Sequence, residues 1–213
     1  QRRHDCENGE DQPHRWGEPS AQPVQRAGRV KHTLRLAQCN PHGSEPAQAQ
    51  PECIFSNLVQ ADWCRLGIGL YGASPVTGHP AAEYGLTPAM TLIAQIIALH
   101  NVKQGETVGY SQTWTAPRDS VIATVGIGYA DGYPRHCPNG TPVVVRGQRG
   151  QLVGRVSMDM ISIDVTHIEA VALGDDVELW GAQLPVDEVA DWAGTISYEL
   201  ITRVSARVPR VTG

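Results

Sequence analysis

From residue 90 to residue 180 the sequence is a succession of short apolar stretches separated by turn residues. Residues 90–100 form the longest stretch, while residues 121–127 and 161–165 alternate apolar side chains with small or polar ones. Alternation with a period of two is typical of a β-strand that has one buried face and one wet face. Short strands joined by regular turns favour an antiparallel β-barrel that is closed or nearly closed. We therefore expect a mainly β fold.

Turn signals between these stretches predict further strands. Glycine-containing turns are expected at residues 103–106 and 147–150, the second as the connection of a β-hairpin. Residues 107–114 and 177–180 have extended character. The sequence thus places Tyr110, in the first of these segments, on a strand.

Helical periodicity appears only near the C-terminal end. Apolar residues recur with helical spacing from Val186 to Ala193, and Gly194 predicts the end of that helix. Thr195 is expected to cap a second short helix that reaches residue 204. The fold class expected is therefore an antiparallel β-barrel with a short C-terminal helical segment.

The first 51 residues have a different composition. They hold six of the fifteen prolines and four of the eight histidines, but no Ile, Phe or Tyr. A segment with so few apolar residues cannot offset its loss of conformational entropy by burial. We expect residues 1–52 to be poorly ordered or frame-shifted, with residues 30–36 forming at most a helical turn or a short strand.

Charge and cysteine usage exclude some classes of function. The net charge of −5 argues against nucleic-acid binding, because affinity for phosphates comes from Lys and Arg. No apolar run approaches the roughly 20 residues that span a membrane. Five scattered cysteines, an odd number, fit a reducing cytoplasm better than a disulfide framework.

Two apparent motifs carry little weight. Residues 67–72 spell Gly-x-Gly-x-x-Gly, but the Pro and Gly residues that follow cannot form the helix that a dinucleotide site requires. These glycines can still hold a single phosphate with their backbone amides. Cys6 with His4 and His14, and Cys39 with His42, match no zinc spacing, so we expect no metal site.

Two tyrosines lie among glycines, Tyr110 and Tyr129. A tyrosine on a strand usually packs in a core or an interface with its hydroxyl at the wet edge. The flanking glycines, however, remove the bulk that would hide the phenol, and Asp131 and Arg135 add charge close to Tyr129. A phenol in such a place can act as a base.

Five motifs in order resemble the C-terminal part of the alanine racemase family, pyridoxal-phosphate enzymes that interconvert L- and D-alanine. They are residues 65–72 (RLGIGLYG), 108–114 (VGYSQTW), 128–135 (GYADGYPR), 154–159 (GRVSMD) and 195–199 (TISYE). The resemblance runs from about Cys53 to Arg210. It implies a C-terminal β-domain over residues 89–213, with residues 53–88 as the remnant of an N-terminal (β/α)₈ barrel and a linker.

The resemblance also implies roles for individual residues. Tyr110 matches the second catalytic base, which works opposite a cofactor-binding lysine. Arg65 matches the residue that faces the pyridine nitrogen of pyridoxal phosphate. The other matches are the phosphate-binding Gly67, Ile68 and Tyr198, Met158, whose backbone N–H meets the substrate carboxylate, and the entrance residues Tyr129, Arg135, Arg155 and Asp159. In the family a homodimer completes the site.

The chain departs from the family in its lysines. It contains only Lys31 and Lys103, and neither lies in a motif that matches the cofactor-binding lysine. The resemblance therefore implies a racemase that supplies D-alanine for peptidoglycan, but we expect this chain alone to be inactive. Two alternatives remain open: a non-catalytic β-barrel for interaction or dimerisation, and a decayed racemase fragment. A preference for alanine over serine is also left open.

Overall fold

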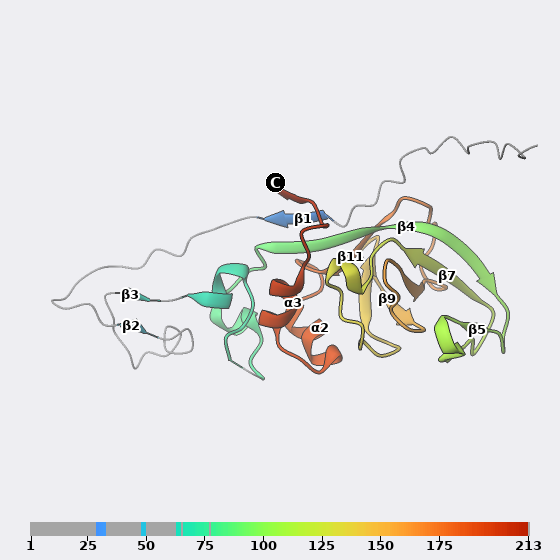
Figure 1. Cartoon of the computed structure of the whole chain (residues 1–213), viewed down its shortest axis with the longest axis horizontal. Coiled ribbons are helices and arrows are strands. Elements are labelled where there is room, and N and C mark those ends of the chain that lie inside the picture. The colour runs from blue at the N-terminus through green and yellow to red at the C-terminus, as the bar shows by residue number, and fades with distance from the viewer. Residues whose placement is uncertain (1–28, 33–47, 50–62, 65, 77, 213) are drawn as a thin grey trace, which may run out of the picture.

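The computed structural model describes residues 29–32, 48–49, 63–64, 66–76 and 78–212. Its centre is a barrel of six antiparallel strands, closed because the two strands at the ends of this row of six pair with each other (Figure 1). The expected mainly β barrel is confirmed. In spatial order its strands are β11 (Asp176–Trp180), β8 (Pro142–Val145), β9 (Gln148–Val153), β10 (Ile161–Asp164), β7 (Ser120–Val125) and β4 (Met90–Val102).

The long strand β4 closes the barrel because its two halves have different partners. Its first half pairs with β11, its second half pairs with β7, and the pairing with β7 contains a bulge between Ile96 and Ala98. Side chains from Met90 to Ile96 alternate between buried and partly exposed, as the sequence predicts for a strand with one wet face. The bulge bends the strand, so that one chain segment serves both edges of the closure.

The interior of the barrel is filled by aliphatic side chains from every strand and by one aromatic pair. The rings of Tyr133 and Trp180 stack with their centroids 6.3 Å apart and an interplanar angle of 12°. Other fully buried large side chains are Leu92, Ile96, Ile127, Leu152, Ile161, Ile163, Leu179, Leu184 and Leu200. The barrel thus has a packed core and no central channel.

Two helices follow the last barrel strand. Helix α2 spans Val186–Ala193 and ends at Gly194, as predicted, with its apolar face buried. Helix α3 spans Ser197–Arg203. The predicted Thr195 cap is wrong: Ile196 is the N-cap residue, and the Thr195 hydroxyl donates to the Glu199 carboxylate instead.

Two short strands extend the sheet beyond β4. Strand β1 (Arg29–His32) pairs with the first half of β4, and β12 (Arg210–Thr212) pairs in parallel with β1 (Figure 1). Of the expected poorly ordered segment, the structure describes only β1 and β2 (Gln48–Ala49), which pairs with β3 (Trp63–Cys64). Strand β1 supports the strand alternative for residues 30–32, and the rest of residues 1–52 lies outside the described residues.

Two 3₁₀ helices precede β4. Helix η1 (Gly67–Tyr71) covers the Gly-x-Gly-x-x-Gly motif and ends at Gly72, and η2 covers Ala81–Tyr84. The motif therefore opens no α-helix, in agreement with our rejection of a dinucleotide site. In Figure 1 these two helices lie between β3 and the helices α2 and α3, and the hairpin of β5 (Thr107–Val108) and β6 (Trp114–Thr115) lies at the opposite side of the barrel.

Candidate functional site

One surface pocket, with a volume of about 440 Å³, brings together six of the predicted site residues. They come from three segments that are well separated in sequence. The lining consists of Tyr110, Ser111, Tyr129, Arg135, Arg155, Val156, Ser157, Met158, Asp159 and Met160. The sequence motifs pointed to six of these ten residues: the two tyrosines, the two arginines, Met158 and Asp159.

Tyr110 lies on a turn and not on a strand. It begins the 3₁₀ helix η3 (Tyr110–Gln112), which connects β5 to β6, so the predicted extended conformation of residues 107–114 is wrong in its middle. Ser111 and Gln112 adopt left-handed backbone conformations with φ of 62° and 52°. The turn directs Tyr110 into solvent, where 71% of its surface is exposed. Its hydroxyl is therefore accessible to a ligand in the pocket.

A close approach between two glycines sets the position of this turn. Gly109, with φ of +82°, lies so near Gly154 that a Cβ on Gly109 would be 3.1 Å from the Gly154 Cα. Gly154 itself has φ of +74°. Side chains at either position would separate the turn from the loop that continues into Arg155. The same close contact thus explains why glycine occurs at both positions, Gly109 in the motif of residues 108–114 and Gly154 in the motif of residues 154–159.

Tyr129 forms a second wall from the 3₁₀ helix η4 (Tyr129–Asp131). The Asp131 carboxylate accepts a hydrogen bond from the Gly128 N–H at 2.9 Å and so closes the start of this helix. A Cβ on Gly128 would lie 2.4 Å from the carbonyl oxygens of Ser157 and Met158. Only glycine permits the two walls of the pocket to approach this closely.

The loop of residues 155–160 forms the third wall and is bonded to η4 by two backbone hydrogen bonds. The Tyr129 N–H donates to the Ser157 carbonyl, and the Ala130 N–H donates to the Met158 carbonyl, both at 3.0 Å. In a trans peptide the C=O and the N–H point in opposite directions. Because the Ser157 carbonyl faces η4, the Met158 N–H of the same peptide points away from η4.

Charge in the pocket is predominantly positive. Arg135 lies with its guanidinium carbon 6.0 Å from the centroid of the Tyr129 ring, and Arg155 belongs to the same lining. Asp159 is paired with Arg207, whose guanidinium also contacts Asp131 at 3.3 Å. Because Arg207 offsets the charge of Asp159, the two lining arginines leave an excess of positive charge that suits a carboxylate ligand.

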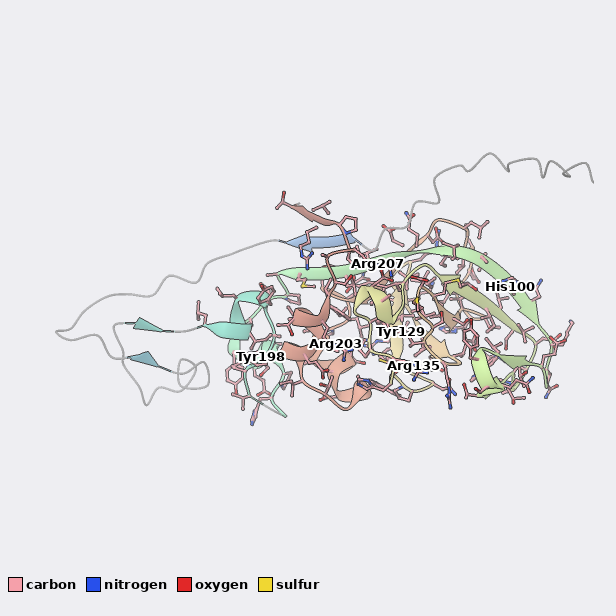
Figure 2. The ribbon with its side chains drawn as sticks, viewed as in Figure 1. His100, Tyr129, Arg135, Tyr198, Arg203 and Arg207 are labelled. Atoms are coloured by element: carbon pink, nitrogen blue, oxygen red, sulfur yellow. The ribbon has the colours of Figure 1, made fainter. Side chains whose placement is uncertain are left out.

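The predicted cofactor-binding residues form a separate group. Gly67 and Ile68 lie in η1, and Tyr198 lies on α3 with about a third of its surface exposed. Figure 2 shows Tyr198 toward the end of the molecule that holds η1, while Tyr129 and Arg135 lie near its middle. Arg65 lies outside the described residues. None of these residues lines the pocket that contains Tyr110.

The one lysine whose side chain is described is unsuited to covalent chemistry. Lys103 lies on the turn after β4, and its amine donates to Asp119 at 2.7 Å. This hydrogen bond raises the pKa of Lys103, so the amine stays protonated. A protonated amine is not a nucleophile.

Sequence reasoning assigned no role to several residues that line or position the pocket. Asn139 bonds to Thr113 and Gly154 next to the lining, Arg207 bonds to Asp159 in the lining, and Ser111, Val156, Ser157 and Met160 line the pocket. Ser111, Val156 and Ser157 lie inside the motifs of residues 108–114 and 154–159, and Met160 follows the second motif, so the motifs were a usable signal for these four. Within the described ranges no helix is long and apolar enough to cross a membrane, and no cluster of metal-ligating side chains is found. The cysteines and histidines weighed as metal ligands, Cys6, Cys39, His4, His14 and His42, lie outside those ranges.

Comparison with known proteins gives a consistent result. The family profile described as alanine racemase, C-terminal domain, matches residues 89–212. An alanine racemase from Alteromonas mediterranea is 60% identical over 149 residues, which cover 70% of this chain and 41% of that protein. The chain thus spans about two fifths of the length of the curated relatives it matches.

Solved structures agree with the sequence relatives. The biosynthetic alanine racemase from Pseudomonas aeruginosa superposes with a TM-score of 0.74 at 52% identity, covering 78% of this chain and 46% of that one. The racemase from Bartonella henselae, solved with covalently bound pyridoxal phosphate, superposes with a TM-score of 0.64 at 34% identity, covering 72% of this chain and 42% of that one. The barrel and the helices therefore have close structural counterparts.

Proposed function

Because the chain belongs to the alanine racemase family, with residues 89–212 forming that family's C-terminal domain, we propose that it supplies part of a racemisation site for alanine. The observation that carries the proposal is the pocket in which the exposed Tyr110 lies together with Tyr129 and Met158. The pocket unites a potential base, a backbone N–H and positive charge.

Racemisation removes the Cα hydrogen from one face of an amino acid and returns a hydrogen to the other. Two bases, one on each face, perform this without rotating the substrate. We assign the Tyr110 hydroxyl to one face, where it holds or accepts the proton. The Met158 N–H and the positive charge of Arg135 and Arg155 would bind and orient the substrate carboxylate. Tyr129 and Asp159 would narrow the entrance.

The proposed cofactor is pyridoxal phosphate, which when bound supplies the electron sink that makes the Cα hydrogen acidic. The residues assigned to it are all hydrogen-bond donors: the amides of Gly67 and Ile68, the Tyr198 hydroxyl and the Arg65 guanidinium. Such a donor set fits a phosphate and an unprotonated pyridine nitrogen, which are acceptors. The cofactor seen in the Bartonella henselae racemase supports this assignment.

The separation of the two groups of residues supports a site shared between subunits. The Tyr110 pocket and the η1–Tyr198 group lie at different places on the chain. In the proposed homodimer, the pocket of one subunit faces the cofactor of the other. Since neither lysine matches a cofactor-binding position, we propose that the chain alone is inactive and acts with an intact subunit that provides the lysine.

The likeness to a biosynthetic racemase supports a role in supplying D-alanine for peptidoglycan, in the cytoplasm. A second candidate is a non-catalytic dimerisation domain. Exposed apolar side chains at Leu70, Tyr71, Ile196 and Tyr198 favour an interface of some kind. The two candidates differ in whether the chain restores catalysis to a partner.

Complementation between subunits tests the proposal. The partner is the Pseudomonas aeruginosa racemase in which the tyrosine that aligns with Tyr110 is replaced by phenylalanine, and D-alanine formation is measured with added pyridoxal phosphate. We expect the chain to restore activity to this partner and to show none by itself. The Tyr110→Phe chain should restore at least about 100-fold less, because it lacks the proposed base.

The matched control is Tyr84→Phe, which removes the hydroxyl of a tyrosine outside the pocket and should restore activity fully. Size-exclusion chromatography of each mixture measures pairing independently of activity. Pairing without restored activity would favour the dimerisation domain. Equal activity with Tyr110→Phe would eliminate Tyr110 as a base.

A further inference from the structure

Asn139 lies outside the pocket but bonds to two residues that adjoin its lining, Thr113 and Gly154. Its Nδ2 donates to the carbonyl of Thr113 at 3.0 Å, and its Oδ1 accepts from the N–H of Gly154 at 2.7 Å. The orientation of the amide is fixed by chemistry, since a backbone N–H can only donate and a carbonyl can only accept. One side chain thus connects the Tyr110 turn to the loop that begins at Gly154.

The backbone around Asn139 is anchored in the barrel. The neighbouring Gly140 N–H donates to the Leu152 carbonyl at 2.8 Å, and the Leu152 N–H donates to the Thr141 carbonyl at 2.8 Å. Leu152 is fully buried on β9. The Asn139 amide therefore extends from a rigid support.

The Tyr110 turn needs such a support. Ser111 and Gln112 have positive φ, a conformation that costs residues other than glycine free energy and persists only where the surroundings hold it. Within the part of the chain that the structure describes, the bond from Asn139 is the only side-chain hydrogen bond that reaches residues 109–115 from outside them. The backbone contributes the pairing of β5 with β6 at the ends of the turn and one hydrogen bond inside it, from the Gln112 N–H to the Gly109 carbonyl at 3.2 Å.

We propose that Asn139 is a positioning residue that fixes the Tyr110 hydroxyl relative to the loop of residues 155–160. Asn139 touches neither the substrate nor the cofactor, and it acts through Thr113 and Gly154. The inference rests on the proposed function, because the position of the Tyr110 hydroxyl matters for catalysis only if that hydroxyl acts as the base. Asn139 lies in none of the five sequence motifs, so this role is an additional structural cause for the placement of the base.

Two substitutions separate the two bonds. Asn139→Asp keeps an oxygen for the Gly154 N–H but turns the donor to Thr113 into an acceptor that repels its carbonyl. Asn139→Ala removes both bonds. The matched control is Asn101→Asp, the same change of an amide to a carboxylate at an exposed position of β4 that does not belong to the pocket lining.

The first measurement is backbone ¹⁵N relaxation of the chain by itself. We expect Asn139→Asp to lower the order parameters of the Tyr110 and Ser111 amides from about 0.85 toward 0.6 while the Gly154 amide stays ordered. Asn139→Ala should lower the order parameters of all three amides, and Asn101→Asp should change none of them. Unchanged order at Tyr110 in both Asn139 variants, or a loss of order spread over the whole barrel, would overturn the proposal.

The second measurement is the complementation assay. Asn139→Asp should lower kcat by about tenfold to a hundredfold with pairing to the intact subunit unchanged, because a misplacement of about 1 Å has an effect of that size. A mobile Tyr110 turn with unchanged kcat would refute the positioning role. If even the unchanged chain restores no activity, the proposed function fails, but the relaxation data still decide whether Asn139 holds the turn.

Discussion

At the scale of single residues, the electrostatics of the pocket depend on an arginine outside its lining, Arg207. Arg207 holds Asp159 at 2.6 Å and also contacts Asp131, which caps η4. An isolated exposed ion pair contributes little to stability, but a guanidinium shared by two carboxylates that are each less than half exposed has a defined geometry. Arg207 therefore joins the walls that carry Tyr129 and Met158, and it reduces the negative charge that a substrate carboxylate would meet.

Cys137 gives a prediction for the dependence of stability on pH. Burial raises the pKa of its thiol from about 9 to about 11. Below pH 9 the thiol is protonated in both the folded and the unfolded chain. Between pH 9 and pH 11 the unfolded thiol ionises while the folded one stays neutral, so the free energy of unfolding should fall. The fall should amount to about 3 kcal/mol, at about 1.4 kcal/mol for each tenfold change in proton affinity.

The measurement is urea denaturation at a series of pH values for the unchanged chain and for Cys137→Ala. The difference in unfolding free energy between the two reports the thiol together with its coupling to Tyr133, whose pKa is also raised partly by Cys137, because the remaining titrating groups are common to both. We expect this difference to be constant below pH 9 and to shrink above it. A difference that does not change with pH would mean that burial does not raise the pKa of the Cys137 thiol.

At the scale of elements, the short 3₁₀ helices and loops determine the shape of the pocket, while the barrel strands hold them. The direct hydrogen bonds between helix η4 and the loop of residues 155–160 join main-chain groups. The approach of the helix to the loop depends on the absence of a side chain at Gly128. The pocket wall is therefore sensitive to a single methyl group.

We predict that Gly128→Ala lowers the free energy of unfolding by about 2–4 kcal/mol, since the new Cβ would displace two carbonyls and break two hydrogen bonds. Gly126→Ala is the control, because its Cβ would meet only the Ile97 Cγ2 at 3.4 Å and the Gln95 carbonyl oxygen at 3.8 Å, both close to ordinary van der Waals contact. The control should cost less than about 1 kcal/mol. Denaturation in urea measures both variants, and equal effects would show that close packing at Gly128 is not the cause.

At the scale of the whole molecule, the barrel closes through β4 and β11 without help from β1. We predict that a chain truncated to residues 63–213 keeps the barrel, whereas β12 loses its pairing with β1. Hydrogen exchange should then show unchanged protection of the β11 amides and of the β4 amides that pair with β7, and faster exchange at Val211, at Thr212 and at the β4 amides that pair with β1. Loss of protection in β11, or in the part of β4 that pairs with β7, would mean that the preceding segment is required for closure.

The amino-acid sequence alone determined the elements whose signal is local. The alternation in residues 121–127 and 161–165 predicted two barrel strands, and the apolar spacing from Val186 predicted α2, because a strand or helix period is contained in a few consecutive residues. Motif residues likewise pointed to most of the pocket lining.

Only the tertiary structure decided how these parts meet. The turn at Tyr110 follows from the approach of Gly109 to Gly154 and from the bond to Asn139, contacts between segments far apart in sequence. The same holds for the separation of the Tyr110 pocket from η1 and Tyr198. Contacts of this kind depend on how strands align across a closed sheet, and no local period records that alignment.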